Sequence, residues 1–78
     1  MTYPLLEARR ARDGDGWLVA VINHATDGEP IPARLPWLTQ LAPQSVQELT
    51  GEGGRLSPTE AVEFSPLAVR IFRYTKAP

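Results

Sequence analysis

His24 is the only histidine in the sequence, and histidine is the side chain best suited to metal binding and to proton transfer near neutral pH. Asp27 and Glu29 follow closely, so the three side chains together could offer ligands to a metal ion. The segment that carries them is rich in turn-forming residues, where such groupings are common by chance. We therefore favour a turn histidine over a metal ligand, and we expect neither a metal nor a cofactor.

The segment made of Asp13, Gly14, Asp15 and Gly16 offers two carboxylates at the spacing with which a calcium-binding loop begins. The further ligands of such a loop and its bidentate glutamate are missing at the required spacing. Two consecutive Asp-Gly pairs instead supply residues that adopt a positive φ at low cost, as tight hairpin turns demand. These four residues therefore predict a structural hairpin turn.

Catalytic arrangements are also missing from the sequence. The serines lack the Gly-x-Ser-x-Gly context of a hydrolase nucleophile, and one histidine would have to serve any triad. Glu60 and Glu63 can be posed as a glycosidase pair, but such pairs sit in a deep cleft that a chain of this size can hardly build. The glycine-rich residues 51–54 are followed by Arg55 and not by the Gly-Lys-Ser/Thr of a phosphate-binding loop. We expect no catalytic residue and no enzymatic activity of the chain itself.

Three aromatic residues are candidates for surface contacts: Trp37, Tyr74 and Tyr3. Exposed aromatic rings are the stacking platforms of sugar-binding modules, and Trp37 is the best candidate because it lies in a predicted loop. For Trp37, covering the core or contacting another subunit is nevertheless favoured over a ligand platform. Trp17 begins an apolar strand and is expected in the core or at its rim.

The composition describes one ordinary globular domain. The chain has 78 residues, 42% hydrophobic and 22% charged, with a formal net charge of −1. We expect a single domain over residues 1–78 with its core at about residues 5–75. Arg9, Arg10 and Arg12 cluster, but acidic neighbours favour a solvated strand face. The near-neutral charge argues against nucleic acid or an anionic membrane as a partner, because such binding draws on clustered Lys and Arg.

The sequence also limits what can hold the fold together, and it leaves the cellular compartment open with the cytoplasm slightly favoured. Cysteine is absent, so neither disulfides nor thiolate metal sites are available. No apolar run approaches the roughly 18 residues of a membrane span, and the N-terminus lacks the basic start and apolar core of a signal peptide.

The elements that position these residues are short strands. Residues 5–12 alternate in polarity, with Leu6 and Ala8 on one face and charged residues on the other. Residues 17–22 are apolar on both faces and rich in β-branched and aromatic types, which predicts a strand buried on both sides. Residues 31–35 alternate with prolines, which predicts a strand at a sheet edge. Residues 37–43 allow a short helical turn or an irregular loop over the core.

The second half of the chain continues this pattern. Residues 45–50 predict a strand closed by the glycine-rich turn at 51–54. Residues 61–65 and 67–74 each alternate, and Pro66 between them should mark a bend or a crossing. The sequence therefore predicts an all-β fold, a small antiparallel β-sandwich of about six to eight short strands with no substantial helix. Several sandwich topologies share this pattern, so strand order stays open.

Three segments, taken in order, resemble the small β-sandwich domains at the C-terminus of many glycoside hydrolases, most closely family 42 β-galactosidases and related barrel glycosidases of the α-amylase clan. Residues 11–24, ARDGDGWLVAVINH, resemble the family's hairpin, in which an apolar strand runs into an Asn-His or similar pair. Residues 46–52, VQELTGE, are similar to a strand that ends in a Thr-Gly turn. Residues 62–72, VEFSPLAVRIF, resemble the closing stretch of two strands around a proline.

The resemblance implies a non-catalytic accessory domain that packs on the catalytic barrel domain of a parent glycosidase. In such enzymes the catalytic carboxylates reside in the barrel, so no catalytic residue is carried over to this chain. Asn23 matches the polar residue at the strand end, and we expect it to cap the turn through side-chain hydrogen bonds. Without its barrel, such a domain would expose an apolar patch and could form a homo-oligomer through it.

Two other functions remain open. A carbohydrate-binding module would expose coplanar aromatic side chains, and Trp37 with Tyr74 or Tyr3 are the residues that would test it. A stand-alone protein-interaction module could share the fold by convergence, because fold does not determine function.

Overall fold

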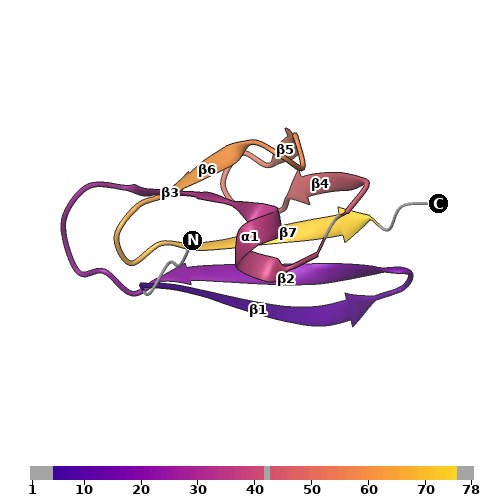
Figure 1. The fold of residues 1–78 in the computed structure, drawn as a ribbon, viewed down its shortest axis with the longest axis horizontal. Helices are drawn as coiled ribbons and strands as arrows, with labels where there is room; N and C mark the ends of the chain where they lie inside the picture. Colours follow the sequence, from indigo (N-terminus) through magenta and orange to yellow (C-terminus); the bar gives the residue numbers. More distant parts are fainter. Residues whose placement is uncertain (1–4, 42, 76–78) are drawn as a thin grey trace.

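The computed structural model describes residues 5–41 and 43–75, except for the side chain of Trp37 (Figure 1). It contains seven strands and one short helix: β1 (Leu6–Asp13), β2 (Gly16–Asn23), β3 (Ile31–Arg34), α1 (Leu35–Thr39), β4 (Ser45–Glu48), β5 (Gly54–Leu56), β6 (Ala61–Phe64) and β7 (Val69–Thr75). The predicted all-β fold is confirmed. The five-residue α1 is the one helix in the described part of the chain.

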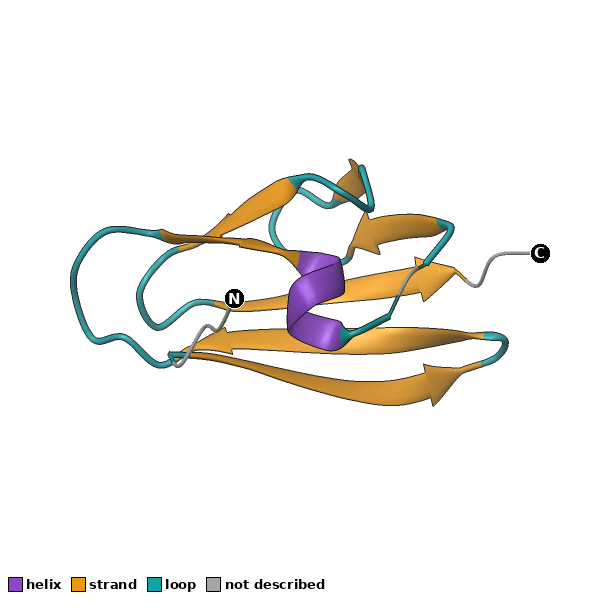
Figure 2. Cartoon of the chain, in the orientation of Figure 1, coloured by secondary structure: helices purple, strands orange, loops and turns teal. Residues whose placement is uncertain are grey.

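The strands form two antiparallel sheets (Figure 2). The larger sheet has five strands in the order β1-β2-β7-β4-β5, and the smaller consists of β3 paired with β6. β3 therefore lies at an edge, as its prolines predicted. Pro66 stands in the turn between β6 and β7, where the chain crosses from one sheet to the other. This confirms the predicted crossing.

The hairpin between β1 and β2 closes on the Asp13–Gly16 pair, as predicted. Gly14 has φ +61°, and Asp15 does not adopt a positive φ, which is the pattern of a type II′ turn. Gly16 is needed for another reason. A Cβ atom at Gly16 would overlap the carbonyl oxygen of Tyr74, so β7 can approach β2 closely because residue 16 has no side chain.

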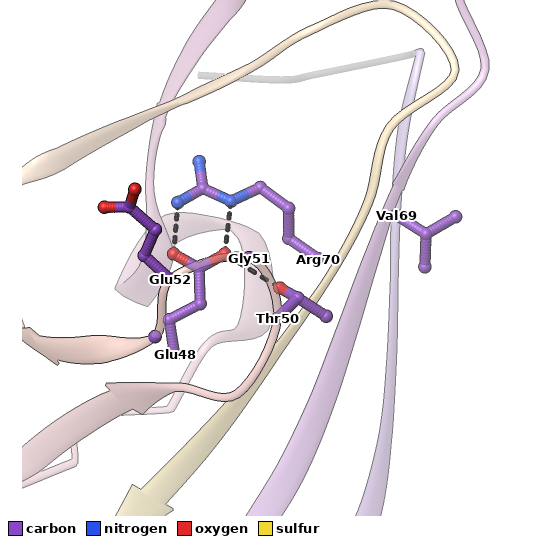
Figure 3. Close-up of a pocket in the computed structure, with 7 residues that line it drawn as sticks. Glu48, Thr50, Gly51, Glu52, Val69 and Arg70 are labelled. Atoms are coloured by element: carbon purple, nitrogen blue, oxygen red, sulfur yellow. Dashed lines mark hydrogen bonds and ion pairs between the residues drawn. The ribbon is translucent and has the colours of Figure 1, made fainter.

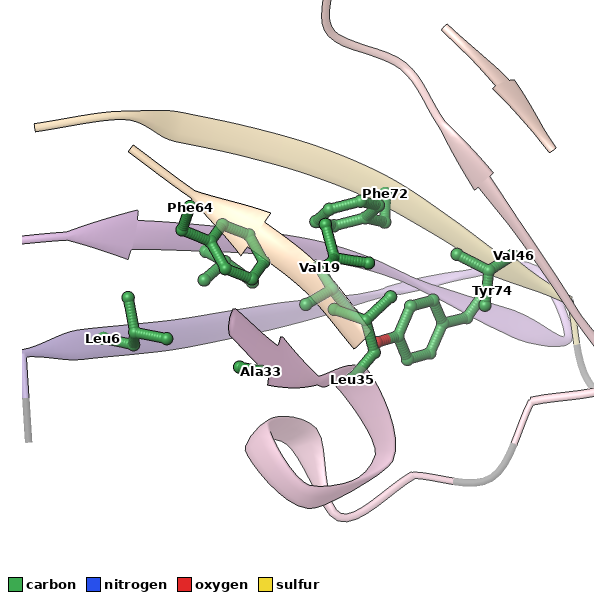
Figure 4. Close-up of a cluster of buried hydrophobic side chains, with 10 residues drawn as sticks. Leu6, Val19, Ala33, Leu35, Val46, Phe64, Phe72 and Tyr74 are labelled. Carbon is green, nitrogen blue, oxygen red and sulfur yellow. The ribbon is translucent and has the colours of Figure 1, made fainter. Parts of the chain in front are cut away.

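One face of the five-stranded sheet packs against the smaller sheet and α1, and the apolar core lies between them (Figure 4). We call this the inner face. Phe64 from β6 and Phe72 from β7 meet edge to face, with ring centroids 6.2 Å apart. The buried apolar side chains are Leu6, Val19, Val21, Ala33, Leu35, Val46, Val62, Phe64, Phe72 and Tyr74.

The structure corrects one prediction about the middle of the chain and decides between two alternatives for another segment. Residues 17–22 are not buried on both faces: Val19 and Val21 are fully buried, but the side chains on the other face are half-buried. No second layer among the described elements covers that face. Residues 37–43, predicted as either a helical turn or a loop, begin inside α1. This helix starts at Leu35, has Pro36 in its first turn and ends at Gln40, which adopts a left-handed conformation.

Candidate functional site

The three candidate aromatic residues do not form a surface platform in the described structure. Tyr74 lies on the inner face of β7 and is 2% exposed, so its prediction as a surface contact is wrong. It is buried because it shares a strand face with Phe72, two positions away. Tyr3 and the side chain of Trp37 lie outside the described part of the chain.

The hydroxyl of Tyr74 is buried against Thr39. Burial raises the pKa of Tyr74, and the nearby Thr39 side chain offsets only part of this effect. Thr39 donates its own hydroxyl hydrogen to Leu35 O at 2.8 Å. Among the described residues, the Tyr74 oxygen has no partner that meets hydrogen-bond geometry. This leaves a buried polar atom at an energetic cost.

Asn23 joins the two sheets and caps the turn after β2. Its side chain is completely buried and donates from Nδ2 to Phe64 O at 2.9 Å and to Ser65 O at 3.1 Å. Its Oδ1 accepts from Ala25 N at 2.9 Å, which is the predicted turn cap. The bonds to β6 were not foreseen, because no local pattern reveals which distant carbonyl group a side chain will meet.

Asp13, at the start of the predicted hairpin turn, forms an ion pair on the face of the five-stranded sheet that points away from the core. Asp13 accepts from Arg73 Nε at 3.1 Å, which links the start of the hairpin to β7.

His24 Nε2 lies 2.8 Å from Glu7 Oε1, and Arg9 donates to the same carboxylate. Together they lower the pKa of Glu7, with His24 the larger cause. His24 therefore faces β1.

The metal interpretation of His24 finds no geometric support in the described residues. His24 is paired with Glu7, and the described residues contain no group of three or more His, Cys, Asp or Glu side chains placed to hold a metal ion.

An ion pair between Glu48 of β4 and Arg70 of β7 lies on the inner face (Figure 3). Arg70 donates to Glu48 through two nitrogens, and the Nε bond is 2.7 Å long. Arg70 also donates to Glu63 O of β6 at 2.6 Å, and its guanidinium lies over the rings of Phe64 and Phe72. This arginine therefore connects both sheets.

Thr50 completes this network. It donates to Glu48 Oε2 at 2.8 Å and accepts from Ile71 N at 3.2 Å. The bonds from Arg70 lower the pKa of Glu48, and the same pair raises the pKa of Arg70. Beside the pair lies an open hollow of about 520 Å³, bounded by the glycine-rich turn after β4. The polar groups of the pair are already bonded within the protein, so the hollow offers no free acid, base or nucleophile from them.

The arginine cluster of β1 divides between the two faces of the strand. Arg9 pairs with Glu7 on one face. Arg10 and Arg12 lie on the other face, with their guanidinium carbons 4.9 Å and 4.8 Å from the ring centroid of Trp17. These cation–π contacts occupy the ring of Trp17, which lies at the rim of the core as predicted.

The other face of the five-stranded sheet carries a group of half-buried and exposed apolar side chains. We call it the outer face. Its apolar side chains are Leu18, Ala20 and Ile22 of β2, Val69 and Ile71 of β7, and Leu49 after β4, and it also carries the charged side chains of Glu7, Arg9, Asp13 and Arg73. Val69 is 53% exposed and Leu49 41% exposed. The sequences of β2 and β7 indicate this second apolar face, because in each strand the alternate residues that point away from the core include apolar side chains.

Comparisons with protein-family models, curated proteins and solved structures give no match for this chain. Among the residues that the structure describes, no helix is long and apolar enough to cross a membrane.

Proposed function

We propose that this chain is a non-catalytic docking domain that packs through its outer face on a larger partner domain. The observation that carries this proposal is the row of half-buried and exposed apolar side chains on β2 and β7, with no described element over them. A sheet normally buries an apolar face against another layer. Here one face has such a layer and the other does not.

The outer face has an apolar centre on β2 and β7, with charged side chains beside it. With strands about 4.8 Å apart and about 3.3 Å of rise per residue, the three long strands span on the order of 350 Å² of sheet. That area includes the charged side chains of Glu7, Arg9, Asp13 and Arg73, so the apolar part of the face, on β2 and β7, is smaller. The polar network around Glu48 and Arg70 is internally bonded and supports stability better than it supports ligand binding.

The identity of the partner is proposed from the family resemblance. The three segments that resemble C-terminal domains of glycoside hydrolases favour a catalytic barrel domain of a glycosidase as the occupant of the outer face. On this proposal the chain contributes stability and placement to the enzyme, and the reaction takes place in the barrel.

The proposal can be tested on the isolated chain by sedimentation velocity at several concentrations. We expect weak self-association, because two outer faces can cover one another when no partner is present. Val69→Ser should weaken that association several-fold, because Val69 is exposed on the outer face. Ala61→Ser, an exposed position on the smaller sheet, is the matched control and should leave association unchanged.

A titration with soluble glycans and insoluble polysaccharides distinguishes the alternative, a carbohydrate-binding module. The docking proposal predicts no binding at millimolar sugar. Saturable binding that Val69→Ser leaves intact would contradict the docking proposal and favour the module.

A further inference from the structure

Arg10 and Arg12 of β1 lie on the inner side of the strand, and neither has an acidic partner in the described structure. All nine Asp and Glu residues of the chain belong to its described part, and the ion pairs that they form there involve other basic residues. The alternation of β1 is the reason, because it turns Glu7 and Asp13 to the outer face, where they pair with other side chains. The acidic neighbours in sequence therefore leave these two arginine charges uncompensated.

Trp17 brings the two charges close together. It lies opposite Arg12 in the pairing of β1 with β2, and the guanidinium carbons of Arg10 and Arg12 are 4.9 Å and 4.8 Å from the centroid of its ring. Because both carbons lie this near to one centroid, they are at most about 10 Å apart, which is about one Debye length at 0.1 M salt. Two like charges at this distance repel one another, so an anion bound between them would relieve the repulsion.

An open hollow of about 230 Å³ lies beside Arg10. It is bounded by β1, β2 and the end of α1, and its lining consists of Ala8, Arg10, Val19, Leu38, Thr39 and Gln40. Arg10 donates from Nη1 to Thr39 O at 3.3 Å, and its other N–H groups have no acceptor among the described residues. The hollow can therefore contact the apolar body of a small ligand while Arg10 donates to an anionic group on it.

We propose that Arg10, Arg12 and Trp17, together with the hollow beside Arg10, form a binding site for a small phosphate monoester. A phosphate monoester carries close to two negative charges at pH 7 and matches two guanidinium groups, whereas a carboxylate carries only one. A phosphate that accepts from two guanidinium groups at about 2.8 Å sets their carbon atoms up to about 8 Å apart, which lies within the limit set by Trp17. This site lies on the opposite face of the sheet from the proposed docking surface, so the inference goes beyond that function.

The test is a titration of the whole chain at pH 7 and low salt with phenyl phosphate, inorganic phosphate and benzoate, followed by NMR. Phenyl phosphate should bind with a dissociation constant on the order of 1 mM and shift the Nε–H signals of Arg10 and Arg12 and the indole N–H of Trp17. Benzoate should bind at least about tenfold more weakly, because it carries one charge.

Inorganic phosphate separates the two sources of a phosphate group. It should bind several-fold more weakly than phenyl phosphate, because it has no apolar body to contact the hollow. Equal binding of the two would show that the hollow takes no part and would overturn the ester as the ligand. A wild type whose signals do not move at about 20 mM phenyl phosphate excludes the site.

Substitutions test the two arginines. Arg10→Gln and Arg12→Gln should each weaken phenyl phosphate binding about tenfold, and the Lys variants should retain part of it, because lysine keeps the charge but loses the planar fork. Arg55→Gln is the matched control, since it removes the same charge from an exposed position on β5, at the other edge of the sheet, and it should bind like the wild type. Urea denaturation verifies that each variant is folded.

Two results distinguish this inference from its alternatives. An Arg55→Gln variant that loses as much affinity as the Arg10 and Arg12 variants would show that overall charge is responsible, and the inference would be wrong. Val69→Ser, which tests the docking face, should bind phenyl phosphate like the wild type. Failure of the docking proposal and failure of the phosphate site therefore give different results.

Discussion

Glu48 and Arg70 lie 22 positions apart and form a two-point ion pair between neighbouring strands, β4 and β7. Their side chains are 11% and 25% exposed, so the pair is largely shielded from water. The third donor nitrogen of Arg70 bonds to Glu63 O of the smaller sheet. One guanidinium thus ties three strands of two sheets together, and several consequences can be measured.

The stability of the domain should fall in acid because of Glu48. Its pKa in the folded chain lies below the ordinary 4.5, mainly because of the bonds from Arg70. A lowered folded pKa means that the stabilisation is present above the unfolded pKa and is lost as pH falls through the folded pKa. Urea denaturation between pH 7 and pH 3, in roughly half-unit steps, measures this loss.

Glu48→Gln should be less stable at pH 7 by about 2 kcal/mol, because Arg70 loses its charged partner. Its stability should also depend less on pH than that of the wild type. Glu7→Gln is the control: the pKa of Glu7 is also lowered, but Glu7 lies on the surface and its pairs are solvated. A pH profile that Glu48→Gln leaves unchanged would contradict the role of the pair.

Asn23→Ala should destabilise the domain by about 2–3 kcal/mol, because it leaves buried backbone groups of β6 and of the following turn without partners. Asn23→Asp retains an acceptor for Ala25 N but lacks the donor to Phe64 O, and it should also be less stable. His24→Ala, at the exposed neighbour, should change stability little. Thermal unfolding followed by circular dichroism makes the comparison, and equal effects at both positions would refute the bridging role.

Gly16→Ala should cost more stability than Gly14→Ala. At Gly14 the penalty is about 1 kcal/mol, because the new Cβ meets open space and only the positive φ is unfavourable. At Gly16 the new Cβ overlaps Tyr74 O, so β2 and β7 must separate. The amide resonances of β7 should shift in Gly16→Ala and remain in place in Gly14→Ala. Equal stabilities of the two variants would contradict the close approach.

Tyr74→Phe should be as stable as the wild type or more stable by up to about 1 kcal/mol, because it removes a buried hydroxyl that has no described partner. The raised pKa of Tyr74 also predicts that this tyrosine resists ionisation in base while the domain stays folded. Absorbance of the phenolate between pH 9 and pH 12 tests this, in about half-unit steps. A loss of stability in Tyr74→Phe would show that the hydroxyl is bonded.

The local features were predictable because each depends on neighbours in sequence. The hairpin at Asp13 and Gly16, the edge position of β3 and the crossing at Pro66 follow from the backbone preferences of glycine and proline. The cap formed by Asn23 is likewise a contact two residues along the chain. Such contacts need no knowledge of the fold.

The sequence by itself determined the approximate positions of six of the seven strands and that each has two distinct faces. It missed β5, which begins at Gly54 in the segment predicted as a turn. Only the tertiary structure decided which face the second sheet covers, because two-residue alternation defines two faces but does not rank them when both are apolar. Phe72 and Tyr74 face inward, so Tyr74 is buried and Val69 and Ile71 face outward. Both the Glu48–Arg70 pair and the outer face depend on how strands far apart in the sequence pack together, which local patterns do not reveal.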